Sequence, residues 1–201
     1  MTTFHLTTVP AELSWRHSPV MWNVDADDHL TIQAGAKTDW FSDPAGAQRK
    51  DDAPSALFTS ADQEFTLSAS VRVAFASTFD AGALLAHVSD DVWAKLCFEY
   101  SPQRQPMIVS VVTRDVSDDC NSSPLAENSV FLRMTRRNAV LAFHYSLDGG
   151  AWQLVRYFTI GDAPRMSLGF SAQSPTGSGC VAVFSQIHYR SNAVSDLRSG
   201  E

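Results

Sequence analysis

The sequence predicts an all-β protein, built as an antiparallel sandwich or barrel. Apolar and polar residues alternate with a period of two through most of the chain. Residues typical of tight turns separate the alternating segments, and no long segment shows the 3.6-residue period of a helix. Many short strands joined by tight turns are typical of antiparallel all-β folds.

Eleven segments carry the alternation. In chain order they cover residues 29–34, 56–60, 64–75, 81–88, 92–100, 106–113, 129–137, 139–147, 152–159, 166–173 and 180–189. The clearest is 64–75, where Phe65, Leu67 and Val71 share one face and polar residues from Thr66 to Arg72 share the other. Residues 106–113 are apolar on both faces, so we expect that strand to lie inside a sheet.

The length of 201 residues suits one domain with a sizeable core. We expect a single domain over residues 1–190 and a polar C-terminal tail over 191–201 that frays. The polar, proline-containing stretch 43–54 is expected to be a long surface loop within the domain. Loops of this length in compact domains are often binding loops.

The net charge of −7 argues against nucleic acid and against anionic membranes as partners, because an acidic surface repels both. The N-terminus shows no signal-peptide pattern, and no apolar run approaches the ~20 residues of a membrane helix. The three cysteines are widely spaced and are expected to be free thiols, which favours a cytoplasmic location.

No cofactor and no metal ligand set is predicted. The six histidines show neither HxH nor HExxH spacing, and the cysteines form no CxxC pair. The acidic stretch 117–119 is expected to be a short loop after the strand 106–113. Loop carboxylates of this kind can hold Ca²⁺, but a turn with solvated carboxylates is the favoured interpretation because no calcium-loop pattern is present.

The segment 92–100 is the best candidate for the wall of a cleft. One face is apolar throughout, and the other carries Trp93, Lys95, Cys97 and Glu99. An aromatic ring and a thiol that alternate with a cation and an anion suit an enclosed polar site. The alternative is an exposed face with a lysine–glutamate pair of little energetic value.

Three further side chains have two interpretations each. His144 lies mid-strand among apolar neighbours and is either a ligand contact or a structural histidine. Arg156 either anchors a ligand or pairs with an internal carboxylate such as Glu99. Trp40 precedes the long polar loop and either stacks on a sugar ring or fills the core.

Enzyme patterns are weak in this chain. Glycosidases of this architecture place paired carboxylates on one strand face, whereas Glu99 is the only acid in the middle of a predicted strand. A second carboxylate would have to come from elsewhere, such as Asp39 or Asp118. No GxSxG motif is present. Enzymatic activity is therefore unsupported, and a binding role is favoured.

Several motifs resemble one family. They lie at residues 93–100, 109–114, 117–121, 145–152, 152–158 and 169–179. Together they resemble the family of unknown function that includes the fungal regulation-of-enolase protein, over roughly residues 10–190. The resemblance implies a concanavalin A-like lectin/glucanase domain, that is, a jelly-roll sandwich of two antiparallel sheets.

The resemblance also implies that several polar side chains converge on one cleft. Combined with the candidates above, the predicted ligand-binding residues are Lys37, Asp39, Trp40, Lys95, Glu99, Thr113, Asp118, His144, Arg156 and Gln173. Ser117 belongs to the same group of converging residues. No catalytic residue is implied.

Three functional hypotheses follow. The first is a binding domain that holds a small polar ligand, a saccharide or sugar phosphate, in a concave cleft. The second is a regulatory protein that binds a metabolic enzyme such as enolase. The third is a glycosidase-like enzyme that uses Glu99 as acid or base. Sheet edges of jelly rolls often pair, so a homodimer is compatible with all three.

Overall fold

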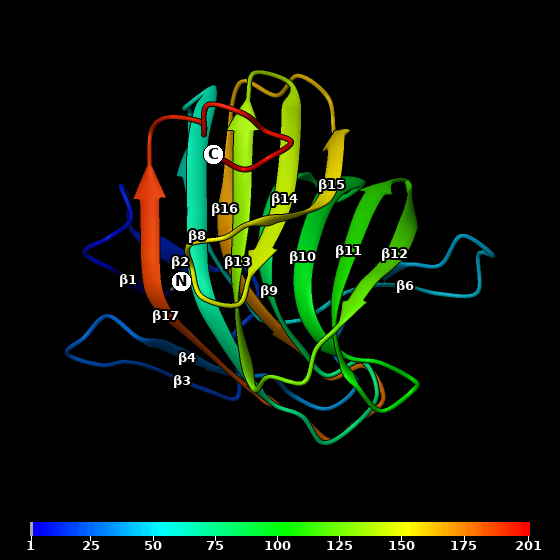
Figure 1. Cartoon of the computed structure of the whole chain (residues 1–201). Coiled ribbons are helices and arrows are strands. Elements are labelled where there is room, and N and C mark those ends of the chain that lie inside the picture. The colour runs from blue at the N-terminus through cyan, green and yellow to red at the C-terminus, as the bar shows by residue number, and fades with distance from the viewer. Residues whose placement is uncertain (1) are drawn as a thin grey trace.

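The computed structural model describes residues 2–201 and consists of two antiparallel sheets packed face to face (Figure 1). Sheet A has eight strands in the order β1-β2-β7-β16-β9-β10-β11-β12, and sheet B has seven in the order β15-β14-β13-β8-β17-β4-β3. A separate two-stranded hairpin, β5-β6, lies beside sheet A. The predicted all-β sandwich is confirmed.

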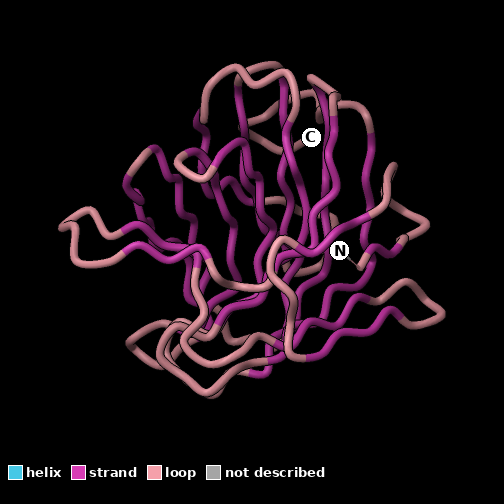
Figure 2. The backbone as a smooth tube through the Cα atoms, turned by 180° about the vertical axis from the view of Figure 1, so that it is seen from behind, coloured by secondary structure: helices cyan, strands magenta, loops and turns pink. Residues whose placement is uncertain are grey.

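The strands of sheet A are β1 (Thr3–Phe4), β2 (Leu13–Trp15), β7 (Ser55–Ser60), β16 (Met166–Gln173), β9 (Ala81–Ser89), β10 (Val92–Tyr100), β11 (Pro106–Arg114) and β12 (Val116–Pro124). Those of sheet B are β15 (Gln153–Thr159), β14 (Val140–Ser146), β13 (Ser129–Arg137), β8 (Glu64–Ala74), β17 (Val181–Arg190), β4 (Leu30–Gln33) and β3 (Met21–Val24). The hairpin consists of β5 (Trp40–Ser42) and β6 (Arg49–Asp51). Figure 2 shows strands and loops from behind.

The main core lies between the two sheets. On β8 the side chains of Phe65, Leu67, Ala69 and Val71 are fully buried, as the period of two predicts. They meet inward-facing residues of sheet A such as Phe98 on β10. Interdigitating apolar faces of two sheets form the core of a β-sandwich.

A second apolar cluster lies on the opposite face of sheet A. It contains Trp40, Trp93, Cys97 and Val111, together with neighbouring alanines and leucines. Trp40 at the start of the β5-β6 hairpin covers this face. The stretch 43–54, predicted to be a plain surface loop, therefore includes strand β6 and belongs to a structured cover over sheet A.

The acidic stretch 117–119 is not a loop, and that prediction is wrong. It lies within β12, which pairs with β11 from Arg114↔Val116 to Met107↔Pro124. Val116 is the only large aliphatic residue in this strand, so an alternation of apolar and polar residues could not reveal it. Backbone hydrogen bonds to a buried neighbour hold this edge strand.

The segment 191–201 does not fray, and that expectation is also wrong. Val194 and Leu197 are buried against Ala142 on the outer face of sheet B. Figure 1 shows this red segment folding back over the upper part of sheet B. These two apolar residues, with hydrogen bonds from Arg133 and Arg137 to backbone carbonyls of the segment, hold it on sheet B. Within residues 2–201, no helix has the length and apolar character needed to cross a membrane.

Candidate functional site

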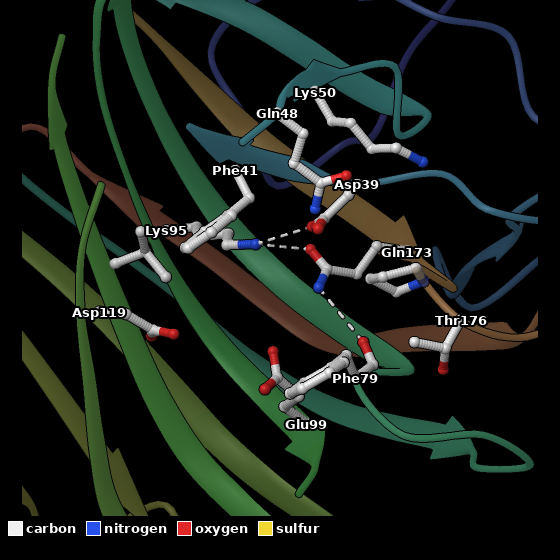
Figure 3. Close-up of a pocket in the computed structure, with 12 residues that line it drawn as sticks. Asp39, Phe41, Gln48, Lys50, Phe79, Lys95, Glu99, Asp119, Gln173 and Thr176 are labelled. Atoms are coloured by element: carbon white, nitrogen blue, oxygen red, sulfur yellow. Dashed lines mark hydrogen bonds and ion pairs between the residues drawn. The ribbon is translucent and has the colours of Figure 1, made fainter. Parts of the chain in front are cut away.

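A pocket opens on the outer face of sheet A, under the β5-β6 hairpin (Figure 3). Its volume is about 200 Å³. Strands β10, β11 and β12 supply its floor, and the hairpin, the turn before β9 and the end of β16 supply its walls. The residues that line it are Asp39, Phe41, Gln48, Lys50, Phe79, Lys95, Glu99, Val111, Asp119, Gln173, Pro175 and Thr176.

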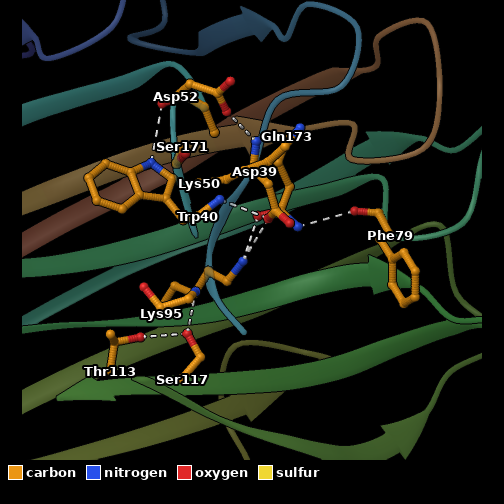
Figure 4. A network of polar contacts seen from close by, with 12 residues as sticks. Asp39, Trp40, Lys50, Asp52, Phe79, Lys95, Thr113, Ser117, Ser171 and Gln173 are labelled. Atoms are coloured by element: carbon orange, nitrogen blue, oxygen red, sulfur yellow. Dashed lines mark hydrogen bonds and ion pairs between the residues drawn. The ribbon is translucent and has the colours of Figure 1, made fainter. Parts of the chain in front are cut away.

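Lys95 is the centre of the polar network. The residue is 3% exposed, and its ammonium group donates to Gln173 Oε1 at 2.7 Å and lies 3.4 Å from Asp39 Oδ1 (Figure 4). Burial acts to lower the pKa of Lys95, but the negative charges around it, Asp39 first, outweigh burial and raise it. Lys95 is therefore a charged donor in the floor of the pocket.

Gln173 links Lys95 to Phe79, an aromatic residue with an unusual backbone conformation. Its Nε2 donates to the backbone carbonyl of Phe79 at 3.2 Å. Phe79 has a φ of 70°, in the left-handed region that bulky residues avoid, and its side chain is 37% exposed. Strained, exposed aromatic residues beside a polar pocket are typical of ligand-contact positions.

Glu99 on β10 and Asp119 on β12 add two carboxyl groups to the lining of the pocket. Burial, with added repulsion from Asp119 and Asp39, raises the pKa of Glu99 to about 8 in spite of Lys95. Burial also raises the pKa of Asp119. Glu99 is thus protonated at neutral pH and can donate a hydrogen bond, whereas Asp39 serves as acceptor and partner of Lys95.

Two phenylalanines, not Trp40, supply the aromatic surface of the pocket. Trp40 is fully buried, and its Nε1 donates to Ser55 Oγ at 2.9 Å. Its ring packs edge-on against Trp93 with centroids 5.4 Å apart. Of the two interpretations of Trp40, the structure therefore places it in the core, and Phe41 and Phe79 are the rings in contact with the cavity.

Thr113 lies below the pocket and supports the hairpin. Its hydroxyl is hydrogen-bonded to Ser117 Oγ at 2.9 Å, and Ser117 Oγ accepts from the backbone N–H of Ser42 at 2.9 Å. Both hydroxyls are buried. This chain of hydrogen bonds fixes β5 over sheet A and so positions the wall of the pocket.

The remaining predicted residues lie elsewhere. Lys37 is at the rim, where its ammonium donates to the carbonyl of Thr176. Asp118 and Arg156 form an ion pair at 2.7 Å that joins β12 to β15, because Asp118 alternates with the pocket-facing residues of its strand. His144 is fully buried on sheet B, beneath the segment 191–201. The structure does not bring these four into the cavity.

The sequence interpretation missed several lining residues. Asp119 was not assigned because β12 was taken for a loop, and strand alternation would have placed it beside Ser117. Phe41, Gln48 and Lys50 come from the hairpin, whose strands are only three residues long. Phe79 lies in a turn, where no periodic signal exists.

Among the residues that the structure describes, no cysteine and no group of metal-ligand side chains lines the pocket. Cys97 lies fully buried beneath it, and burial raises the pKa of its thiol well above the usual range. Among residues 2–201, the one group of three side chains placed like metal ligands is Asp25, Asp27 and His29, and none of these three lines the pocket. Acidic clusters of this kind are common without an ion.

The fold and the pocket together define a β-sandwich domain with an enclosed polar site on one sheet. The model of the family described as "Protein of unknown function (DUF1349)" matches residues 15–192, and the chain belongs to this family. No curated protein matches it.

Solved structures share the fold. A functionally unknown protein from Saccharomyces cerevisiae is 23% identical, with a TM-score of 0.83 over 92% of this chain and 97% of that one. A GH43 protein from Bacillus licheniformis is 14% identical, with a TM-score of 0.67 over 87% of this chain and 35% of that one. The carbohydrate-binding module CBM66 from Bacillus subtilis is 10% identical, with a TM-score of 0.57 and coverages of 88% and 94%. These likenesses confirm the predicted jelly-roll fold.

Proposed function

We propose that this protein binds a saccharide in the pocket on the outer face of sheet A. The observation that carries the proposal is the composition of that cavity: fixed donors and acceptors facing the same space as two aromatic rings. A cavity of about 200 Å³ corresponds to roughly seven waters at ~30 Å³ each, which suits a ligand of about one sugar ring.

Each part of the pocket matches a part of a sugar. Hydroxyl groups donate and accept, so they pair with Asp39 as acceptor and with Lys95 and protonated Glu99 as donors. The C–H faces of a sugar ring pack on aromatic rings, here Phe41 and Phe79. Apolar surfaces with a few fixed polar groups are typical of small-molecule sites.

The charge of the pocket favours a neutral sugar. The ammonium of Lys95 already faces the Asp39 carboxylate, and Lys50 and Asp119 add one further cation and one further acid, so with Glu99 protonated the lining has no excess of positive charge. A sugar phosphate, the other ligand predicted from the sequence, would bring its charge next to these acids. One of the solved structures with this fold is a carbohydrate-binding module, which agrees with the proposal.

Calorimetric titration with a panel of neutral mono- and oligosaccharides tests the proposal. We expect at least one sugar to bind, and Phe79→Ala to weaken that binding about tenfold, which corresponds to about 1.4 kcal/mol. Tyr157→Ala is the matched control, because Tyr157 is a similarly exposed aromatic residue on the other sheet. Absence of binding across the panel would contradict the proposal.

Glycoside hydrolysis is a second candidate, and the protonation of Glu99 favours it. A carboxyl group with a pKa of about 8 can protonate a leaving oxygen at neutral pH, and Asp119 lies in the same cavity as a second carboxyl. Release of reducing sugar by the wild type, abolished in Glu99→Gln with the sugar still bound, would establish hydrolysis. Binding without turnover would leave the protein a binding module.

Three narrower predictions accompany the proposal. Association with enolase, implied by the family resemblance, is tested by co-purification with enolase as bait. A cytoplasmic location agrees with three free cysteines and is tested by cell fractionation. Homodimer formation through the exposed sheet edges is tested by sedimentation analysis.

A further inference from the structure

A row of buried polar side chains crosses the outer face of sheet B, on the opposite side of the sandwich from the pocket. Arg133 on β13 stands in register with His144 on β14, and Thr135 follows Arg133 on the same face. Arg133 is 4% exposed, and Thr135 and His144 are fully buried. Such residues are rarely buried without partners.

The segment 193–201 covers this row. Gly200 accepts a hydrogen bond from Arg133 Nη2 through its carbonyl at 2.6 Å. Val194 and Leu197 supply the apolar contacts of the cover, against Ala142. The segment 193–201, which we call the strap, therefore covers the polar row and is held there by two apolar residues and a few hydrogen bonds.

With the strap in place, the polar row still has side-chain atoms without a hydrogen-bond partner. Four polar atoms have no hydrogen-bond partner among residues 2–201: Arg133 Nε, Thr135 Oγ1 and both ring nitrogens of His144. The backbone of Leu197 lies beside the imidazole but makes no hydrogen bond of normal geometry with it. Arg133 Nε and Thr135 Oγ1 can each donate to an oxygen. One ring nitrogen of a neutral His144 can do so as well, or both if the imidazole is protonated.

The same surface carries positive charge without an ion-pair partner. The Arg133 guanidinium stacks on Trp152, 3.9 Å from the ring centroid. Burial and the neighbouring Arg190 lower the pKa of Arg133 to about 10, so the group stays charged at neutral pH. Neither arginine has a carboxylate within 4.0 Å among the described residues, although Glu201 lines the same cavity of about 480 Å³.

We propose that this face of sheet B is a second ligand site, which binds a small oxyanion through Arg133, Arg190 and His144, and that the segment 193–201 is an exchangeable strap over it. Arg133 Nε and Nη2 form the side-on fork that recognises carboxylate or phosphate oxygens. Trp152 supplies a flat surface for the body of the ligand. The Gly200 carbonyl occupies the oxyanion position while the strap is closed.

Gly200 makes the strap experimentally separable from the site. It has a φ of +81°, and a Cβ there would collide with the Arg133 guanidinium and approach both His144 and Trp152 to 3.1 Å. Gly200→Ala therefore weakens strap docking without changing a residue of the proposed site. Gly161→Ala is the matched control, because Gly161 also has a positive φ, +96°, but open space around its Cβ position.

The test is a titration of the full chain with inorganic phosphate, and separately with acetate, followed by amide NMR shifts. We expect Gly200→Ala to bind phosphate at least tenfold more tightly than the wild type, with shifts centred on Arg133 and Trp152, and Gly161→Ala to match the wild type. The acetate arm decides whether carboxylates or only phosphates are accepted.

Arg133→Gln and Arg190→Gln, each combined with Gly200→Ala, locate the site. Arg190 is exposed, so its variant keeps the fold even if loss of the buried Arg133 does not. Each is expected to abolish the tighter binding. Equal phosphate affinity in the wild type and Gly200→Ala, or binding that persists in Arg190→Gln, would overturn the proposal. Neither result bears on saccharide binding at sheet A.

Discussion

Replacing Glu99 by glutamine is expected to stabilise this protein, and to do so more strongly as the pH rises. Glu99 is 7% exposed, and burial raises its pKa from 4.5 to about 8. Folding therefore holds the carboxyl in its neutral form at a pH where the unfolded chain releases the proton. Glutamine has the same shape and no proton to release.

The size of the effect follows from the two pKa values. A group whose pKa is raised on folding contributes stability that is present below 4.5 and is lost as the pH rises towards about 8. At ~1.4 kcal/mol per pH unit, the cost in the wild type is about 1 kcal/mol at pH 5 and about 3 kcal/mol at pH 7. Glu99→Gln removes this cost.

Urea unfolding of the wild type and Glu99→Gln at pH 5 and pH 7 measures the difference. We expect the stability advantage of the variant to grow by about 2 kcal/mol between the two pH values, and its Tm at pH 7 to rise by about 6–12 °C. Glu12→Gln is the control, since Glu12 is exposed. An advantage that is the same at both pH values would refute the reasoning.

Three other predictions concern the same site and the thiols. Lys95→Met should destabilise the protein by about 3–5 kcal/mol in urea unfolding, because it leaves Asp39 without its buried cation; a loss below 1 kcal/mol would contradict the buried pair. Phe79→Gly should be more stable than Phe79→Ala by about 1 kcal/mol, since only glycine accepts a φ of 70° without strain; equal stabilities would show that the strain is absent. A thiol reagent should label Cys120 alone in the native protein and all three cysteines after unfolding; rapid native labelling of Cys97 would contradict its burial.

The alternation of the sequence predicted the fold well because most strands have one face in the core. All eleven predicted strands are present, with ends within one residue of those observed. The strands that escaped prediction are short or lie at sheet edges, such as β3 and β12. There, backbone pairing rather than a buried face decides the structure, and no apolar period marks it.

The candidate site was predictable only in part, for a related reason. Lys95 and Glu99 interrupt an otherwise buried strand, so their positions on β10 stood out. Asp39 and Gln173 join them through the tertiary contacts that Lys95 on β10 makes with the segment before β5 and with β16, and here the family resemblance supplied what spacing alone lacked. His144, like Lys95, is a polar residue among apolar neighbours in a predicted strand, but it lies on the outer face of sheet B, opposite the pocket.

That error has a general cause. The alternation shows which side of its own strand a residue occupies. It does not show which sheet contains that strand, or on which face of the sandwich the residue lies. A buried polar residue can therefore be recognised from sequence while its site is assigned wrongly. The two polar regions of this protein, around Lys95 and around Arg133, are distinguished only by the topology.

The central claim, that the pocket under the β5-β6 hairpin binds a saccharide, is tested most directly by a crystal structure with the best-binding sugar from the titration panel. We predict that the sugar ring contacts Phe41 and Phe79, with its hydroxyl groups hydrogen-bonded to Lys95, Glu99 and Asp39. A sugar bound elsewhere on the surface, with this cavity unchanged, would contradict the account.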